Sequence, residues 1–213
     1  MTMPTSHHPP SQHPTTGRRQ QLHEQRARAA ATQTRRRRLF RAGTVLAALL
    51  IAGVVAFGLW SARPTSGSAS GRAPDFTLTT TAGTKVSLSD FRGKPVVLYF
   101  NEGAGCASCT QQMALIEQDP EFAASGIVVL PIVMNTAAEI QPDLARFGVS
   151  TPYLLDDGTV SKAYNTIGKG MHAGLPGHGF VLIDADGNQL WQGDYPSMYL
   201  APADLLREVR SRI

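Results

Sequence analysis

Two cysteines, Cys106 and Cys109, are the only ones among the 213 residues, and two residues separate them in the stretch GAGCASC. Such a pair can exchange a disulfide with another thiol, supply two thiolate ligands to a metal, or form a structural disulfide that stabilises the fold. A staple stabilises a fold most when it closes a long loop, and this loop is short. The spacing therefore favours a redox couple over the two alternatives, a metal site and a structural disulfide.

The neighbouring sequence predicts where the two sulfur atoms lie. Residues 95–101, PVVLYFN, form a near-continuous apolar run typical of a buried central strand, and residues 106–118 are predicted to be the next helix. A cysteine at a helix N-terminus has its thiolate stabilised by unpaired backbone N–H groups and by the helix dipole. We therefore expect Cys106 to be the nucleophile, and Cys109, one turn later on the same face, to resolve the mixed disulfide. The flanking Gly105 lets a partner's backbone approach closely.

The rest of the C-terminal region alternates strands and helices. Two short strands surround an Ala-Gly turn within residues 75–94, and a second buried strand covers residues 127–134, where Pro131 indicates a strand end or a bulge. The elements expected after it are a helix at 139–147, a strand at 153–155, a helix at 159–167, a hairpin at 179–195 and a helix at 202–213. This order predicts an α/β fold with a mixed central sheet flanked by helices.

The first part of the chain has a different composition. Up to residue 71 there are ten Lys or Arg side chains and one acidic side chain, whereas the remainder has ten basic and fifteen acidic ones. Residues 1–41 are rich in Pro, Gln, His, Thr and Arg and are predicted to be a disordered basic tail. A basic arm can bind nucleic acid, but it is also a membrane topology signal. The next segment favours topology, so no nucleic-acid partner is expected.

Residues 42–62 contain no charged side chain and are long enough, at about twenty residues, to cross a bilayer as one helix. Arg35 to Arg38 and Arg41 precede this segment and only Arg63 follows it closely, which places the N-terminus in the cytoplasm. The alternative is a cleaved signal peptide, but the apolar core is too long and no clear cleavage site follows. Residues 63–72 are expected to be a flexible linker and residues 73–213 an extracytoplasmic domain on a single-pass cell-membrane anchor.

The domain resembles the thioredoxin-like superfamily. It is most similar to the membrane-anchored TlpA/ResA-like thiol-disulfide oxidoreductases and to the alkyl hydroperoxide reductase/thiol-specific antioxidant proteins, a group that includes the redoxins and peroxiredoxins. The stretches that carry the resemblance are APDFTL at 73–78, VSLSDFRGKPVVLYF at 86–100, CASC at 106–109 and GFVLIDADG at 179–187. Together they place most of residues 72–213 within the resemblance.

The resemblance implies a thioredoxin-like fold and an enzyme that exchanges disulfides with protein substrates. No Gly-rich phosphate loop is present for a nicotinamide or flavin, so no cofactor is expected and the electrons would come from a membrane partner. The resemblance also implies that Glu102, four residues before Cys106, shuttles the proton of Cys109. The alternative is that Glu102 is an exposed loop residue without a catalytic role. The peroxidase branch would need a P-x-x-x-T-x-x-C pattern, and counting back from Cys106 gives Gly103 and Tyr99 instead.

The loop before the predicted hairpin is expected to face the cysteines. Thioredoxin-like proteins usually carry a cis-proline there, and in this sequence Pro176 stands one residue early, with Gly177 in the expected place. We therefore expect Pro176, Gly177 and His178, with Gly105, to contact the substrate. His172 and His178 flank this loop, and two thiolates with an imidazole suit Cu(I), as in Sco-type copper chaperones. Those proteins have three residues between their cysteines, so copper binding is the alternative and no metal site is expected.

Overall fold

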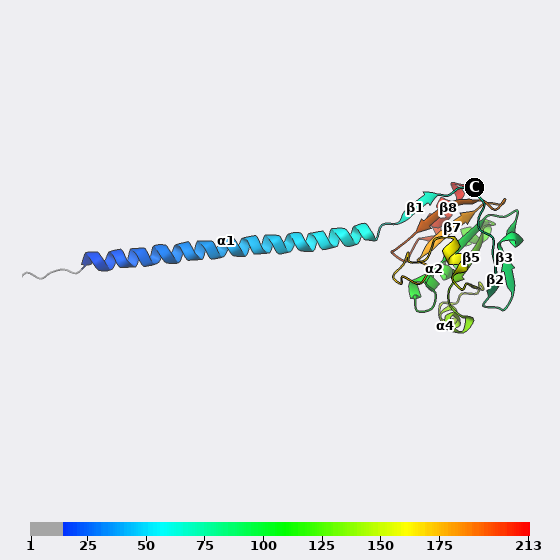
Figure 1. The fold of residues 1–213 in the computed structure, drawn as a ribbon, viewed down its shortest axis with the longest axis horizontal. Helices are drawn as coiled ribbons and strands as arrows, with labels where there is room; N and C mark the ends of the chain where they lie inside the picture. The colour runs from blue at the N-terminus through cyan, green and yellow to red at the C-terminus, as the bar shows by residue number, and fades with distance from the viewer. Residues whose placement is uncertain (1–14) are drawn as a thin grey trace, which may run out of the picture. The chain divides into compact units, whose positions relative to one another are not determined.

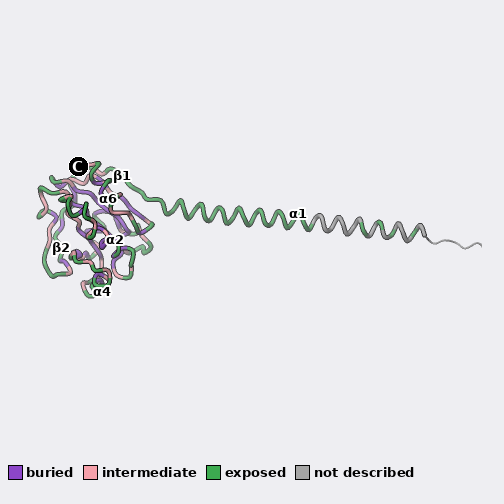
Figure 2. Tube along the Cα trace, turned by 180° about the vertical axis from the view of Figure 1, so that it is seen from behind, coloured by how far each residue is buried: buried purple, intermediate pink, exposed green. Residues whose placement is uncertain are grey.

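The computed structural model of the protein describes residues 15–213 and divides the chain into two compact units, at Phe57 and Gly58. Helix α1 (Thr15–Ser61) runs through the first unit and into the second. Its segment Arg36–Ser61 is long and apolar enough to cross a membrane, and all of its residues are exposed (Figure 2). This segment confirms the single apolar helix expected at 42–62.

The predicted tail and linker both need correction. Residues 1–14 of the expected disordered tail lie outside the described residues, but from Thr15 onward the chain is helical. Arg, Gln and Ala dominate this stretch and have high helix propensity, and the apolar helix that follows extends the same ladder of hydrogen bonds. Within the expected linker, strand β1 (Thr65–Ser68) pairs antiparallel with strand β8 (Gln189–Asp194), which supplies hydrogen bonds to this backbone. Only the residues on either side of β1 are left as linker.

One eight-stranded mixed sheet forms the centre of the second unit, in the order β1-β8-β7-β4-β5-β6-β2-β3 (Figure 1). Strands β4, β5 and β6 are parallel to one another, and the remaining neighbours are antiparallel. The other strands are β2 (Thr77–Thr80), β3 (Lys85–Ser87), β4 (Val96–Phe100), β5 (Val128–Val133), β6 (Leu154–Leu155) and β7 (Gly179–Ile183). The expected mixed α/β architecture is confirmed.

Helices cover both faces of the sheet. The side chains of the central strands contribute to two hydrophobic cores, one on each face. Strand β4 is buried at all five positions; Val97 and Tyr99 belong to one core, and Val96, Leu98 and Phe100 to the other. Residues from α2 (Ala107–Gln118), α3 (Pro120–Ala124), α4 (Ala137–Phe147) and α6 (Pro202–Arg210) fill the first core. Residues from the 3-10 helix η1 (Leu88–Phe91) and α5 (Thr159–Ala163) pack into the second. Burial on both faces explains the near-continuous apolar run of this strand.

Strand β5 continues through Pro131, so neither a strand end nor a bulge occurs there. The backbone N–H of Asn101 donates to the carbonyl of Ile132, so the polar backbone groups of Ile132 face β4 and those of Pro131 face the opposite way. On that side β6 begins to pair only at Ile132. The missing N–H of Pro131 therefore costs the sheet no hydrogen bond.

Candidate functional site

Cys106 and Cys109 are joined by a disulfide at the start of α2, with their Cα atoms 5.3 Å apart. Cys106 is the N-cap residue, and its carbonyl accepts the backbone N–H groups of Cys109 at 3.0 Å and Thr110 at 3.2 Å. Cys106 is partly exposed, whereas Cys109 is fully buried. An incoming thiolate or disulfide therefore meets Cys106 first, and Cys109 lies behind it.

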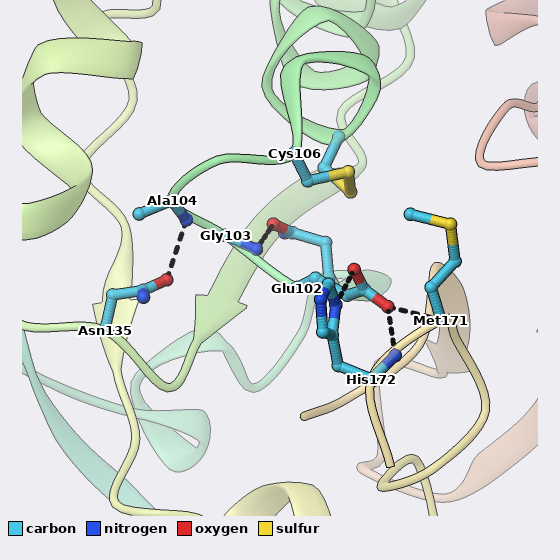
Figure 3. A network of polar contacts seen from close by, with 9 residues as sticks. Glu102, Gly103, Ala104, Cys106, Asn135, Met171 and His172 are labelled. Carbon is cyan, nitrogen blue, oxygen red and sulfur yellow. Dashed lines mark hydrogen bonds and ion pairs between the residues drawn. A yellow bond between two sulfur atoms is a disulfide. The ribbon is translucent and has the colours of Figure 1, made fainter. Parts of the chain in front are cut away.

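Side chains from three separate parts of the chain hold the loop between β4 and the disulfide. The backbone N–H of Gly103 donates to Asn101 Oδ1 at 3.0 Å, and that of Ala104 donates to Asn135 Oδ1 at 2.9 Å (Figure 3). The backbone N–H of Gly105 donates to Asp143 Oδ2 of α4 at 2.9 Å. Gly103 has a φ of 76°, and a Cβ atom on it would collide with the side chain of Asn135. The loop is thus fixed before α2 begins.

Glu102 is buried beside the disulfide, so the alternative of an exposed loop glutamate is wrong. Its side chain is only 3% exposed. Oε1 accepts the backbone N–H of Met171 at 2.6 Å and that of His172 at 3.1 Å, and Oε2 lies 2.8 Å from His172 Nδ1 (Figure 3). This one carboxylate therefore holds a loop that lies about 70 residues away in the sequence.

A cavity of about 290 Å³ lies next to Cys106. It brings together three of the residues expected at the site, Glu102, Gly105 and Cys106. Its lining is completed by Ala104, Met171, His172 and Leu175. Neither Met171 nor Leu175 was expected at the site, and His172 was expected there only as a copper ligand.

Pro176, Gly177 and His178 are buried and none of them lines this cavity, so the contact with the substrate expected of them stays a prediction. Pro176 pairs with Ile167 in an isolated bridge, and its peptide bond is trans, as are all those in the described part of the chain. The backbone N–H of Gly177 donates to the carbonyl of Thr166 at 2.9 Å. Leu175, which directly precedes these three residues, does line the cavity.

The imidazole of His178 packs in the core beneath α2. Its Nδ1 lies 3.1 Å from the hydroxyl of Tyr99, and its ring contacts both Tyr99 and Phe180 edge-on. Burial lowers the pKa of His178 to about 4, so the ring is neutral at physiological pH. Side chains alternate along a strand, so His178 follows the inward direction of Phe180 and Leu182, a signal present in the sequence. Among the side chains that the structure describes, no group of three His, Cys, Asp or Glu is arranged to hold a metal.

A disulfide that opens the helix after the central strand of a mixed, helix-covered sheet defines a redox protein of thioredoxin-like fold. Residues 70–189 match the AhpC/TSA family. The chain belongs to this family, and its relatives include both peroxiredoxins and thiol-disulfide oxidoreductases.

Two relatives and one solved structure illustrate this range. Peroxiredoxin 2 of Thermoplasma acidophilum is 31% identical over 134 residues, which are 59% of this chain and 66% of that protein. Thiol-disulfide oxidoreductase ResA of Geobacillus kaustophilus is 30% identical over 130 residues, 60% of this chain and 74% of that protein. The crystal structure of Peroxidoxin BcpB from Mycobacterium tuberculosis has a TM-score of 0.56 at 21% identity, covering 68% of this chain and 95% of that chain, and it shares the fold.

The chain spans only part of several of these relatives. It covers 66% of the length of the Thermoplasma peroxiredoxin and 54% of the chloroplastic peroxiredoxin Q of Oryza sativa subsp. japonica. The match places this domain in its family, and the activity of the whole protein is inferred from its own site.

Proposed function

We propose that the protein is a membrane-anchored thiol-disulfide oxidoreductase that exchanges disulfides with protein substrates outside the cytoplasm. The observation that carries this proposal is the unequal exposure of one disulfide: Cys106 is partly exposed beside a 290 Å³ cavity, and Cys109 is buried behind it. A structural disulfide needs no such difference in exposure. Disulfide exchange needs one sulfur atom that a partner can reach and a second, less accessible one that resolves the mixed disulfide.

In the reductive direction, the Cys106 thiolate attacks one sulfur of a substrate disulfide, whose S–S bond breaks, and the leaving sulfur takes a proton. Cys109 then loses its proton and attacks the Cys106 sulfur, which releases the second substrate thiol and forms the Cys106–Cys109 disulfide. Two electrons pass from the protein dithiol to the substrate. We infer that a membrane protein with a reactive dithiol restores the reduced pair.

The anchor and its orientation rest on the apolar segment of α1 and on the charges around it. Arg36–Ser61 is the candidate span, and the positive-inside rule favours a cytoplasmic N-terminus because Arg35 to Arg38 precede the apolar stretch. The exchange domain would then lie in an oxidising compartment, where a reductant has disulfides to act on.

A substrate trap tests the proposal. Full-length protein in detergent is reduced, freed of reductant and mixed with insulin. With Cys109→Ser, a mixed disulfide through Cys106 should accumulate, whereas Cys106→Ser should form none, and the wild type should reduce the insulin. Equal mixed-disulfide formation by both variants would contradict the assigned roles. Faster consumption of hydrogen peroxide than of insulin disulfides would instead identify a peroxidase.

Orientation is tested separately in intact cells. A membrane-impermeant maleimide should label Cys106 of the reduced protein from outside, and a cysteine placed at Thr34 should be protected until the membrane is opened. The reverse labelling pattern would overturn the topology and leave the exchange chemistry standing.

A further inference from the structure

Glu102 and His172 form a carboxylate–imidazole pair at the wall of the disulfide cavity. Oε2 of Glu102 lies 2.8 Å from Nδ1 of His172, and because a carboxylate only accepts hydrogen bonds, Nδ1 carries the hydrogen. In the neutral ring, the lone pair is then on Nε2, at the opposite edge. The carboxylate thus selects both the tautomer and the orientation of the ring.

The two members of the pair differ in their exposure. The Glu102 side chain is 3% exposed, whereas that of His172 is 64% exposed, and both line the cavity beside Cys106. Glu102 and Cys106 are the other titratable side chains that line this cavity. A partly exposed ring can collect a proton from water and deliver it to a sulfur atom that enters the cavity.

Glu102 itself is poorly placed to move protons. Its Oε1 accepts two backbone N–H groups, from Met171 and His172, and its Oε2 accepts the ring hydrogen. Three of the roughly four lone-pair sites of the carboxylate are therefore taken by bonds that hold the loop and the ring. The carboxylate is therefore suited to position its neighbour.

We propose that His172 is the catalytic acid–base residue of disulfide exchange at Cys106 and that Glu102 is its positioning residue. This proposal rests on the proposed function and deepens it. When the Cys106 thiolate attacks, the substrate S–S bond breaks and its electron pair goes to the leaving sulfur. The protonated His172 gives its Nε2 proton to that sulfur and becomes neutral, and water then restores the proton. In the opposite direction, neutral His172 removes a proton from an incoming substrate thiol.

The test compares two disulfides that differ in their need for a proton. Hydroxyethyl disulfide releases an aliphatic thiolate, which leaves slowly unless it is protonated, whereas an aromatic nitrothiobenzoate disulfide releases a stable thiolate. Single-turnover rates are measured with pre-reduced full-length protein. His172→Gln can still donate to Glu102 but cannot transfer a proton. It should slow the aliphatic substrate by on the order of 100-fold, in the lower part of the range for general acid–base catalysis, and leave the aromatic rate little changed.

Two further variants separate chemistry from loop structure. Glu102→Gln should also slow only the aliphatic substrate, because its amide oxygen is held by the two backbone N–H groups and its NH₂ group then faces Nδ1, which forces the other tautomer. Gly174→Ala, in the same loop but outside the cavity lining, should change neither rate, because its Cβ would meet nothing within 4 Å.

The outcomes are distinguishable. If His172→Gln slows both substrates equally, or slows neither, His172 is not an acid–base catalyst. If reduced wild-type protein fails to react even with the aromatic disulfide, the proposed function is wrong, since that reaction needs only the Cys106 thiolate.

Discussion

The hydroxyl of Tyr99 lies 2.9 Å from the carbonyl oxygen of Cys109 and donates a hydrogen bond to it. Tyr99 is fully buried in the central strand β4, so this bond joins the sheet to the helix turn that carries Cys109. Burial raises the pKa of Tyr99 well above its ordinary value, so the hydroxyl keeps its hydrogen across the physiological range. The same hydroxyl contacts His178, and one residue thus connects the buried imidazole to the disulfide turn.

Tyr99→Phe should lower the free energy of unfolding by about 1–2 kcal/mol, because a buried hydrogen bond is lost and His178 loses its partner. The ring itself should stay in place, since it stacks on Phe180 with centroids 4.7 Å apart. The measurement is urea unfolding of the full chain in detergent. Tyr153→Phe is the matched control: its hydroxyl is buried without a hydrogen-bond partner among the described residues, so its removal should be neutral or stabilising. Equal losses in both variants would contradict the role given to Tyr99.

Stability should fall between about pH 6.5 and pH 4 because of His178. The unfolded chain takes up a proton on this residue near pH 6.5, the ordinary pKa of histidine, whereas burial in the folded protein lowers the pKa to about 4. Acid therefore favours the unfolded state, and the contribution present at neutral pH declines by up to about 3 kcal/mol at pH 4.

His178→Gln removes this titration, so the variant should lose less stability than the wild type between pH 7 and pH 4.5, whatever its stability at neutral pH. Urea midpoints at several pH values provide the comparison. Parallel pH profiles for the two proteins would show that His178 does not remain neutral in the fold.

Gly170→Ala should disturb the wall of the cavity. A Cβ atom there would collide with Oε1 of Glu102 and crowd the backbone of Gly177, so we expect a loss of about 1–3 kcal/mol and slower disulfide exchange. Gly174→Ala in the same loop is the control, because its Cβ would meet nothing within 4 Å. The control should be unchanged or more stable by about 0.4–1 kcal/mol, since alanine restricts the unfolded chain. Matching effects at both positions would contradict the close packing on Glu102.

Asp143→Asn should speed the alkylation of reduced Cys106 at neutral pH. The carboxylate lies 2.9 Å from the backbone nitrogen of Gly105, next to Cys106, and its negative charge opposes a thiolate there. Asparagine keeps an oxygen that accepts the bond and removes the charge. Iodoacetamide should therefore react a few-fold faster, as expected for a water-screened charge pair worth under about 1 kcal/mol. High salt should shrink the difference, and Asp204→Asn in α6 should have no effect. A rate unchanged at low salt would contradict an electrostatic role for Asp143.

The sequence was a reliable guide wherever a local pattern decides the structure. The apolar run before the cysteines predicted β4, the Asp186-Gly187 turn predicted the β7–β8 hairpin, and the helix opening placed Cys106 at the N-cap of α2. Each of these features depends on side chains within a few residues of one another. The same holds for the apolar segment of α1.

The features that were not predicted depend on contacts between residues far apart in the sequence. The sequence does not show that Glu102 accepts backbone groups of Met171 and His172, nor that β8 offers an open edge to Thr65–Ser68. The alternation with Phe180 indicates the inward direction of His178, whereas the pattern of a cis-proline site favours a position beside the disulfide. Pro131 indicated a strand end or a bulge, and this prediction was wrong. The extent of the neighbouring strand β6 depends on the sheet as a whole and cannot be predicted from nearby residues.

The pairing of β1 with β8 also limits the length of free chain between α1 and the sheet. Only three residues, Ala62 to Pro64, separate the end of α1 at Ser61 from the first paired residue, Thr65. Fully extended, these three residues form a tether that spans about 10 Å. If α1 is the membrane anchor proposed above, a tether this short would keep the domain close to the lipid headgroups, and substrate proteins would have to present their disulfides near the bilayer surface.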